Sequence, residues 1–186
     1  MDDVVEIVSK EVEKRANSKE NFFGIGAFYH IKCVEKNAIY LAKQYGADVE
    51  VVQIAALLHD IASITKKKYI EEHHKYGAEI AEELLTELNY SKEKIELVKK
   101  CILSHRGSVL VEKTTKEEIC VSDADAMSHF DMLPALFNMV YRQMELSIDE
   151  GIKFIREKLD RSCNKLTKDT KKMYEDKIKA IMSILE

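Results

Sequence analysis

Several histidines and aspartates stand where helical periodicity would place apolar residues. In the stretch QIAALLHDIA, residues 53–62, His59 and Asp60 interrupt an otherwise apolar run. His30 lies on the apolar stripe of its own segment, and His105 ends an apolar series in another. An unpaired polar group in a protein core costs a few kcal/mol, so several of them predict a shared partner.

A metal ion is the partner that would satisfy several such groups at once. Neutral imidazoles and carboxylate oxygens suit zinc, iron, manganese or cobalt. The cysteines stand far apart with no C-x-x-C pair, which argues against a purely structural zinc and against a disulfide framework. We expect these four residues to be reduced thiols: Cys33, Cys101, Cys120 and Cys163.

The spacing of the acidic residues limits which of them can share a site. Neighbouring residues on a helix diverge by about 100°, so His59 and Asp60 could straddle one metal, or Asp60 could bridge two. By the same geometry Asp123 and Asp125 diverge by about 200°. Only one of these two carboxylates is therefore expected to point at the site.

The elements that must position these residues are helices. Apolar residues recur at intervals of three and four, and the 186 residues include one proline and six glycines. We expect an all-α fold in a single domain spanning 1–186, with a brief extended stretch at Val109 to Val111. The expected helices cover about 2–16, 27–45, 49–62, 73–88, 92–105, 115–132, 134–159 and 165–185.

Local signals set the expected helix ends. Gly46 suits a left-handed C-cap, and Asp48 is a natural N-cap for the helix that carries the His-Asp pair. Thr115 with Glu118 three residues later forms a capping box. Pro134 suits the first turn of one long helix ending near residue 159.

Composition excludes several partners. The net charge is -4 and charged residues make up 33% of the chain, so no excess of basic charge marks a nucleic-acid or anionic-membrane surface. The N-terminus is acidic at its start and lacks a long apolar run, and no window approaches the length of a membrane span. We expect a cytoplasmic protein without nucleic-acid or membrane partners.

The order His30, His59-Asp60 and a later aspartate resembles the H…HD…D arrangement of the HD-domain superfamily of metal-dependent phosphohydrolases. The stretch AALLHDIA looks like the family's apolar helix ending in HD, and VSDADAM resembles its final acidic helix. The resemblance covers about 28–130, with an N-terminal helix at 2–16 and further helices at about 134–185 as elaborations. It implies a helical bundle of the HD type, and it implies four metal ligands: His30, His59, Asp60 and Asp125.

Two more histidines extend the resemblance. HHKYGAEIA resembles a His-x-x-x-Gly-Ala stretch, which selects His73 over His74 because Gly77 lies four residues after it. ILSHRG resembles a later histidine motif and selects His105. In some members such residues hold a second metal. The resemblance thus implies one or two divalent ions: manganese, iron, cobalt, nickel or zinc, or magnesium.

The implied reaction is hydrolysis of a phosphoester, often on a nucleotide. A divalent metal polarises the phosphoryl oxygen and lowers the pKa of bound water toward about 7. Asp60 and Asp123 are the candidates for orienting or deprotonating that water. Arg106 and Lys66 are the candidates for binding the phosphate of a small-molecule substrate.

Two other classes of function stay open at this point. A six-ligand set also permits a di-iron oxygenase of HD fold, and a sensor could keep metal or nucleotide without turnover. The face formed by Ile148, Ile152, Ile155 and Leu159 could cover the domain's own core or pair with a second copy, giving a homodimer.

Overall fold

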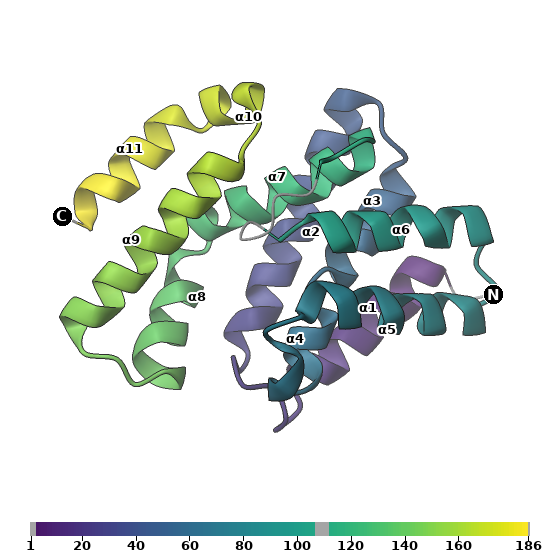
Figure 1. The fold of residues 1–186 in the computed structure, drawn as a ribbon, viewed down its shortest axis with the longest axis horizontal. Coiled ribbons are helices and arrows are strands. Elements are labelled where there is room, and N and C mark those ends of the chain that lie inside the picture. The colour runs from purple at the N-terminus through teal and green to yellow at the C-terminus, as the bar shows by residue number, and fades with distance from the viewer. Residues whose placement is uncertain (1–2, 107–111, 186) are drawn as a thin grey trace.

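The structure, a computed structural model, describes residues 3–106 and 112–185. These residues form helices and connecting turns, with no strand among them, so the all-α fold is confirmed (Figure 1). The expected extended stretch at 109–111 lies outside the described residues. The elements in order are α1 (Val4–Ala16), α2 (Gly26–Tyr45), α3 (Val49–Leu58), α4 (Ile61–Thr65), a 3-10 turn (Lys67–Tyr69), α5 (His73–Glu87), α6 (Lys92–Ser104), α7 (Lys116–Asp131), α8 (Leu133–Phe137), a π-helix (Asn138–Gln143), α9 (Ile148–Lys165), α10 (Lys168–Met173) and α11 (Glu175–Ile184).

The caps that the sequence predicted are present. Gly46 ends α2 in the left-handed region at φ 65°, where a residue without a Cβ is least strained. The Asp48 carboxylate accepts from Val51 N at 3.1 Å and starts α3. Thr115 and Glu118 form both bonds of the capping box that starts α7. These local signals place the starts of α3 and α7 as expected.

The single helix expected over 49–62 is wrong, because it is broken at the His-Asp pair. α3 ends at Leu58 and α4 begins at Ile61. Asp60 has φ -110° and ψ 15°, outside the helical region, which turns the chain between the two helices. His59 and Asp60 therefore occupy a corner of the backbone and not the interior of one helix.

The long helix expected from residue 134 to about 159 is also wrong. Pro134 does stand in the first turn of α8, but α8 is five residues long and continues as a π-helix. Glu145 then adopts a left-handed φ of 54°. Ser147 and Glu150 form a second capping box, which starts α9 as a new helix.

The last expected helix, over 165–185, is divided as well. α9 runs on to Lys165, and the extended backbone of Thr167 separates it from α10. A further break at Tyr174 separates α10 from α11. α9 is consequently longer at its C-terminal end than the sequence suggested.

The helices enclose two apolar clusters that meet at α7. The larger cluster is built from α1 to α7, with Leu57, Leu58 and Ile102 fully buried in it. The smaller cluster joins the end of α7 to α8, the π-helix, α9 and α11, around Ile155 and Leu159. Figure 1 shows α8 to α11 on one side of α7 and α1 to α6 on the other.

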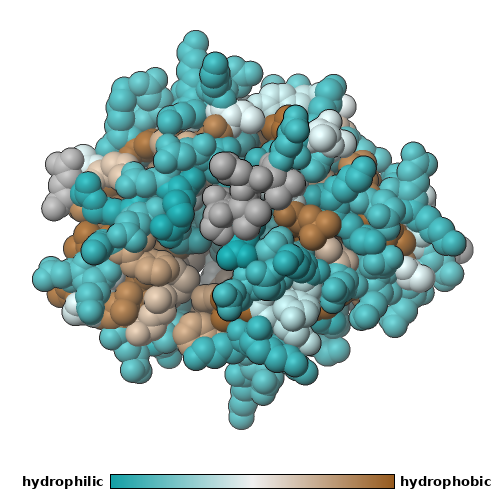
Figure 2. All heavy atoms as spheres, viewed as in Figure 1, coloured by the Kyte–Doolittle hydropathy of each residue, from teal (hydrophilic) through white to brown (hydrophobic). Residues whose placement is uncertain are grey.

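The surface of the molecule is largely hydrophilic on the face shown in Figure 2, with apolar residues in smaller patches. Among the described residues, no helix has both the length and the apolar character needed to cross a membrane. The four cysteines carry free thiols, as expected.

Candidate metal centre

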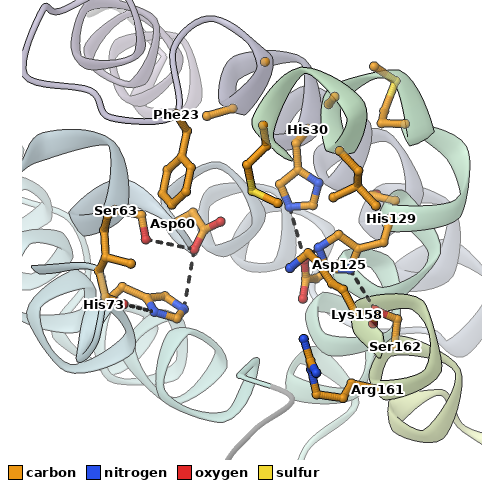
Figure 3. Close-up of a pocket in the computed structure, with 18 of the residues that line it drawn as sticks. Phe23, His30, Asp60, Ser63, His73, Asp125, His129, Lys158, Arg161 and Ser162 are labelled. Atoms are coloured by element: carbon orange, nitrogen blue, oxygen red, sulfur yellow. Dashed lines mark hydrogen bonds and ion pairs between the residues drawn. The ribbon is translucent and has the colours of Figure 1, made fainter. Parts of the chain in front are cut away.

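A cavity of about 670 Å³ lies where the two apolar clusters meet. Figure 3 shows Asp60, Ser63 and His73 on one side of it and His30, Asp125 and His129 on the other. Lys158, Arg161 and Ser162 of α9 complete the view. The cavity is therefore walled by the core bundle and by the C-terminal helices together.

The four ligands implied by the resemblance lie together: His30, Asp60 and Asp125 line this cavity, and His59 is fully buried next to them. His30 Nε2 is 3.2 Å from Asp125 Oδ1, and His59 Nε2 is 3.8 Å from the same oxygen. His59 Nε2 is also 3.5 Å from Asp60 Oδ2. Helix α2, the corner between α3 and α4, and helix α7 each contribute to this group.

A second group shares Asp60. His73 Nε2 and His105 Nε2 are 3.2 Å apart, and they lie 3.5 Å and 3.8 Å from Asp60 Oδ1. Asp60 thus turns one oxygen to His59 and the other to His73 and His105. The backbone corner at Asp60 gives this carboxylate access to both groups.

Backbone carbonyls fix three imidazole rings in the form a metal requires. Nδ1 of His59, His73 and His105 lies 2.7, 2.9 and 2.6 Å from the carbonyl oxygen three residues earlier in the chain. A carbonyl oxygen only accepts, so each Nδ1 carries the proton and each Nε2 keeps a free lone pair. The three free lone pairs face the carboxylates.

The residues fit a divalent cation. Among the described residues, buried His59 Nε2 has no hydrogen-bond partner. Carboxylate oxygens of Asp60 and Asp125 lie 3.5 and 3.8 Å from it, and a lone pair gains nothing from them without a positive charge between. Three sets of side chains have ligand atoms within 4.8 Å of one another and could hold an ion: His30, His59 and Asp60; His30, Asp125 and His129; Asp60, His73 and His105.

The protonation states also suit a metal. Burial lowers the pKa of the His59 and His129 imidazoles, and lowers that of His105 to about 3. Burial opposes ionisation of Asp60, but the neighbouring imidazoles outweigh it and hold its pKa below the usual range. Burial of Asp125 is outweighed in the same way, mainly by Lys165. Neutral imidazoles and ionised carboxylates are the forms that bind metal.

Acid is expected to destabilise the metal-free chain well before its carboxylates protonate. The pKa of His105 is about 3 in the fold against an ordinary 6.5, so within that window the unfolded chain binds a proton that the folded chain excludes. Stability therefore falls as the pH falls through the window, by about 1.4 kcal/mol per pH unit for this group. Urea unfolding in EDTA at about pH 7 and about pH 5 should show the loss. The free energy of unfolding of His105→Gln should fall less between these two pH values. An equal fall in the wild type and the variant would show that His105 does not cause the loss.

The two acidic residues of VSDADAM point in different directions, as the helical geometry predicted. Asp125 lines the cavity. Asp123 is fully buried and accepts from Thr167 N at 3.2 and 3.3 Å and from Thr167 Oγ1. The structure does not bring Asp123 to the metal-binding groups; it places this carboxylate as an anchor for the start of α10.

Replacing Asp123 by alanine is expected to weaken the fold and to leave metal content unchanged. The substitution leaves the Thr167 amide and hydroxyl without their buried acceptor, at a cost of about 1–3 kcal/mol. Asp123→Asn keeps one acceptor oxygen and should lose less. Urea unfolding and metal analysis of the three chains measure the two effects separately. A folded Asp123→Ala chain with lowered metal content would instead place this residue in the site.

The two cations expected at the phosphate lie in different surroundings. Arg106 lines the cavity, and its Nη1 donates to the Glu71 carbonyl at 2.6 Å. Lys66 follows α4 directly, is exposed, and is not among the residues that line the cavity. Of the two cations expected at the phosphate, the structure places Arg106 at the cavity and Lys66 outside its lining.

The sequence reading missed the contribution of α9. Lys158, Arg161 and Lys165 all line the cavity. Their spacing of three and four places them on one face of the helix, which is the signal that could have revealed them. Lys165 Nζ donates to Asp125 Oδ2 and, at 2.7 Å, to the His105 carbonyl. His129, four residues after Asp125, was also missed.

The helical fold and the convergence of His30, His59-Asp60 and Asp125 define a class of metal-binding α-helical domain. Comparison with known families agrees: the HD domain model matches residues 27–129, and the chain belongs to that family.

Similar solved structures share the fold along nearly the whole chain. Bacillus subtilis YpgQ has a TM-score of 0.72 at 17% identity, over 98% of this chain and 91% of that one. A protein from an uncultured Thermotogales bacterium, described as a predicted HD superfamily hydrolase, has a TM-score of 0.65 at 22% identity, over 97% and 88%. A protein of Clostridium beijerinckii is 34% identical over 68 residues, which cover 37% of this chain and only 43% of that protein.

Proposed function

We propose that the chain is a metal-dependent phosphohydrolase that acts on a small phosphoester, such as a nucleotide, through metal-activated water. The observation that carries this proposal is the charge pattern of the cavity. Candidate metal ligands lie on both sides of the cavity, and Lys158 and Arg161 of α9 lie on the side of Asp125 and His129 (Figure 3). Lys165 of α9 lines the cavity as well. A phosphate needs both metal and cations, because its charge must be balanced while its phosphorus is attacked.

The histidines and aspartates hold and shape the proposed centre. His30, His59, Asp60 and Asp125 would bind one ion, and Asp60 with His73 and His105 would bind a second. The bound metal supplies a polarised phosphoryl oxygen and a water molecule of lowered pKa. Asp60 turns one oxygen to each group of imidazoles, so its proposed part is to ligate the metal and to orient the water.

Cations of α9 and Arg106 would bind the phosphate oxygens. Lys158 and Arg161 line the cavity, and the described residues give neither of them an ion pair or hydrogen bond within the protein. Lys165 is already held by Asp125. Charge-assisted hydrogen bonds from such groups to a phosphate are stronger than neutral ones.

An apolar wall would hold the remainder of the substrate. Phe22, Phe23, Leu136, Met139 and Phe154 line the cavity beside the charged groups. Flat aromatic and flexible thioether side chains suit the face of a planar ring. A nucleotide combines such a ring with phosphate, and the structurally similar YpgQ was crystallised in complex with ADP. Fold alone does not determine a substrate, so this likeness shows only that a protein of similar fold binds a nucleotide.

The proposal is tested by metal analysis followed by an activity screen. The purified chain is stripped with a chelator, reloaded with manganese, iron, cobalt, nickel, zinc or magnesium, and offered nucleoside monophosphates, cyclic nucleotides and dinucleoside polyphosphates. Phosphoester cleavage that needs the added metal is the expected result. Bound iron with oxygen consumption would favour an oxygenase, and bound metal without turnover would favour a sensor.

A further inference from the structure

His129 lies at the centre without belonging to the four-residue H…HD…D pattern or to its two-histidine extension. It projects from α7 one turn after Asp125, and its side chain is 10% exposed. Its ring is stacked on that of His30, with centroids 4.9 Å apart and planes 10° apart. His129 Nε2 lies 3.7 Å from Asp125 Oδ1.

The hydrogen bonds of His129 determine where its proton is. Nδ1 lies 2.9 Å from Ser162 Oγ, and the Ser162 hydroxyl donates its one proton to the Lys158 carbonyl at 3.0 Å. Ser162 Oγ can therefore only accept from the imidazole, so Nδ1 carries the proton. Nε2 then keeps a free lone pair directed at Asp125, as in His59, His73 and His105.

Asp125 offers one oxygen to this lone pair. Its Oδ2 accepts from the Lys165 ammonium. Its Oδ1 lies 3.2, 3.8 and 3.7 Å from Nε2 of His30, His59 and His129. Nε2 of His59 and Nε2 of His129 carry no proton, so neither can donate a hydrogen bond to Asp125 Oδ1, and their lone pairs repel this oxygen. A cation bound between them removes the repulsion.

We propose that His129 is an additional metal ligand, which binds through Nε2 the ion that His30 and Asp125 hold, and that Ser162 positions its ring for this. The inference rests on the metal centre of the proposed function. It adds a nitrogen donor to that ion and makes the site richer in imidazole. Such a donor set favours cobalt, nickel or zinc over magnesium, which prefers oxygen ligands.

Cobalt binding to the stripped chain tests the proposal without any substrate. Affinity is measured by titration with Co²⁺, the visible spectrum reports the coordination geometry and ligand field of the ion, and elemental analysis gives the stoichiometry. Losing a residue that only hydrogen-bonds to a metal ligand weakens binding by roughly 10- to 100-fold. His129→Ala should weaken Co²⁺ binding by at least that much, because it removes a ligand. It should change the visible spectrum and weaken Mg²⁺ binding much less.

Ser162→Ala provides a second variant that retains the histidine. It removes the acceptor that fixes the ring, so Co²⁺ affinity should fall by about 10-fold, while a merely structural serine would leave affinity and spectrum unchanged. His74→Ala is the matched control, because His74 is buried on α5 and belongs to none of the sets of side chains that could hold an ion. Circular dichroism establishes that each variant is folded.

The outcomes separate this inference from the proposed centre. Unchanged Co²⁺ affinity and spectrum in His129→Ala, with loss of binding in His59→Ala, would overturn the ligand role of His129 alone. If His129→Ala does not fold, wild-type affinity and spectrum in Ser162→Ala would overturn it. Unchanged binding in His59→Ala would overturn the centre itself, and the inference with it.

Discussion

Replacing His59 by alanine is expected to remove metal from the centre and to lower phosphoester hydrolysis by about 1000-fold. A bound metal contributes several kcal/mol of transition-state stabilisation, and each 1.36 kcal/mol corresponds to a tenfold change in rate. His59 is fully buried at the corner between α3 and α4, and its unpartnered Nε2 faces both Asp60 and Asp125. Elemental analysis of the purified chain and steady-state kinetics with added metal measure the two losses.

His74→Ala is the control for that experiment. It removes an imidazole that is also buried but belongs to none of the sets of side chains that could hold an ion, so metal content should stay near that of the wild type. A His59→Ala chain that keeps its metal and its stability would show that the lone pair of His59 serves packing and not a metal. A His74→Ala chain that loses metal equally would point to a general effect on the fold.

Replacing Lys165 by methionine is expected to destabilise the metal-free chain by about 3–5 kcal/mol, the usual cost of breaking a buried ion pair. Lys165 forms this ion pair with Asp125, and the two side chains are only 7% and 10% exposed. Without the ammonium, Asp125 loses the strongest influence that keeps its buried carboxylate ionised, and the His105 carbonyl loses a donor. Urea unfolding in EDTA measures the loss.

The loss should shrink when metal is added, because a bound cation takes over part of the neutralisation of Asp125. Lys158→Met is the matched control, since burial lowers the pKa of Lys158 and the described residues give it no ion pair. Its stability in EDTA should stay close to that of the wild type. A Lys165→Met chain as stable as Lys158→Met would mean that the ion pair contributes nothing to the metal-free fold.

Signals that act within one helical turn predicted the fold well. Gly46, Asp48 and Thr115 set helix ends through contacts with residues three or four positions away, so the local sequence contains the whole cause. Ser147 with Glu150 is the same kind of signal, and overlooking it produced one helix where the structure has three elements. The break at Asp60 has only a weak local signal: aspartate favours helix N-caps over helix interiors, but the apolar run around it predicts a continuing helix.

The residues of the HD pattern could be predicted because polar side chains stand out on apolar stripes. His30 and His105 show this contrast, and the structure brings both to the cavity. His129 does not, because α7 is buried almost all round between Cys120 and Phe130 and has no polar face against which to compare it. Lys158 and Lys165 look like solvated lysines until the packing of α9 against α7 turns them inward.

Because the cavity lies between two apolar clusters, the residues that would bind metal and those that would select a substrate belong to different parts of the chain. Side chains that would hold the metal come from the bundle of α2 to α7, whereas three of the cations and much of the apolar wall come from α8, the π-helix and α9. Under the proposed function, substitutions in the C-terminal helices at positions other than Lys165 and Ser162 would alter which molecule is accepted while the metal ligands stay in place. A chimaera that joins this bundle to the C-terminal helices of a structural relative would inherit its reaction from one parent and its selectivity from the other.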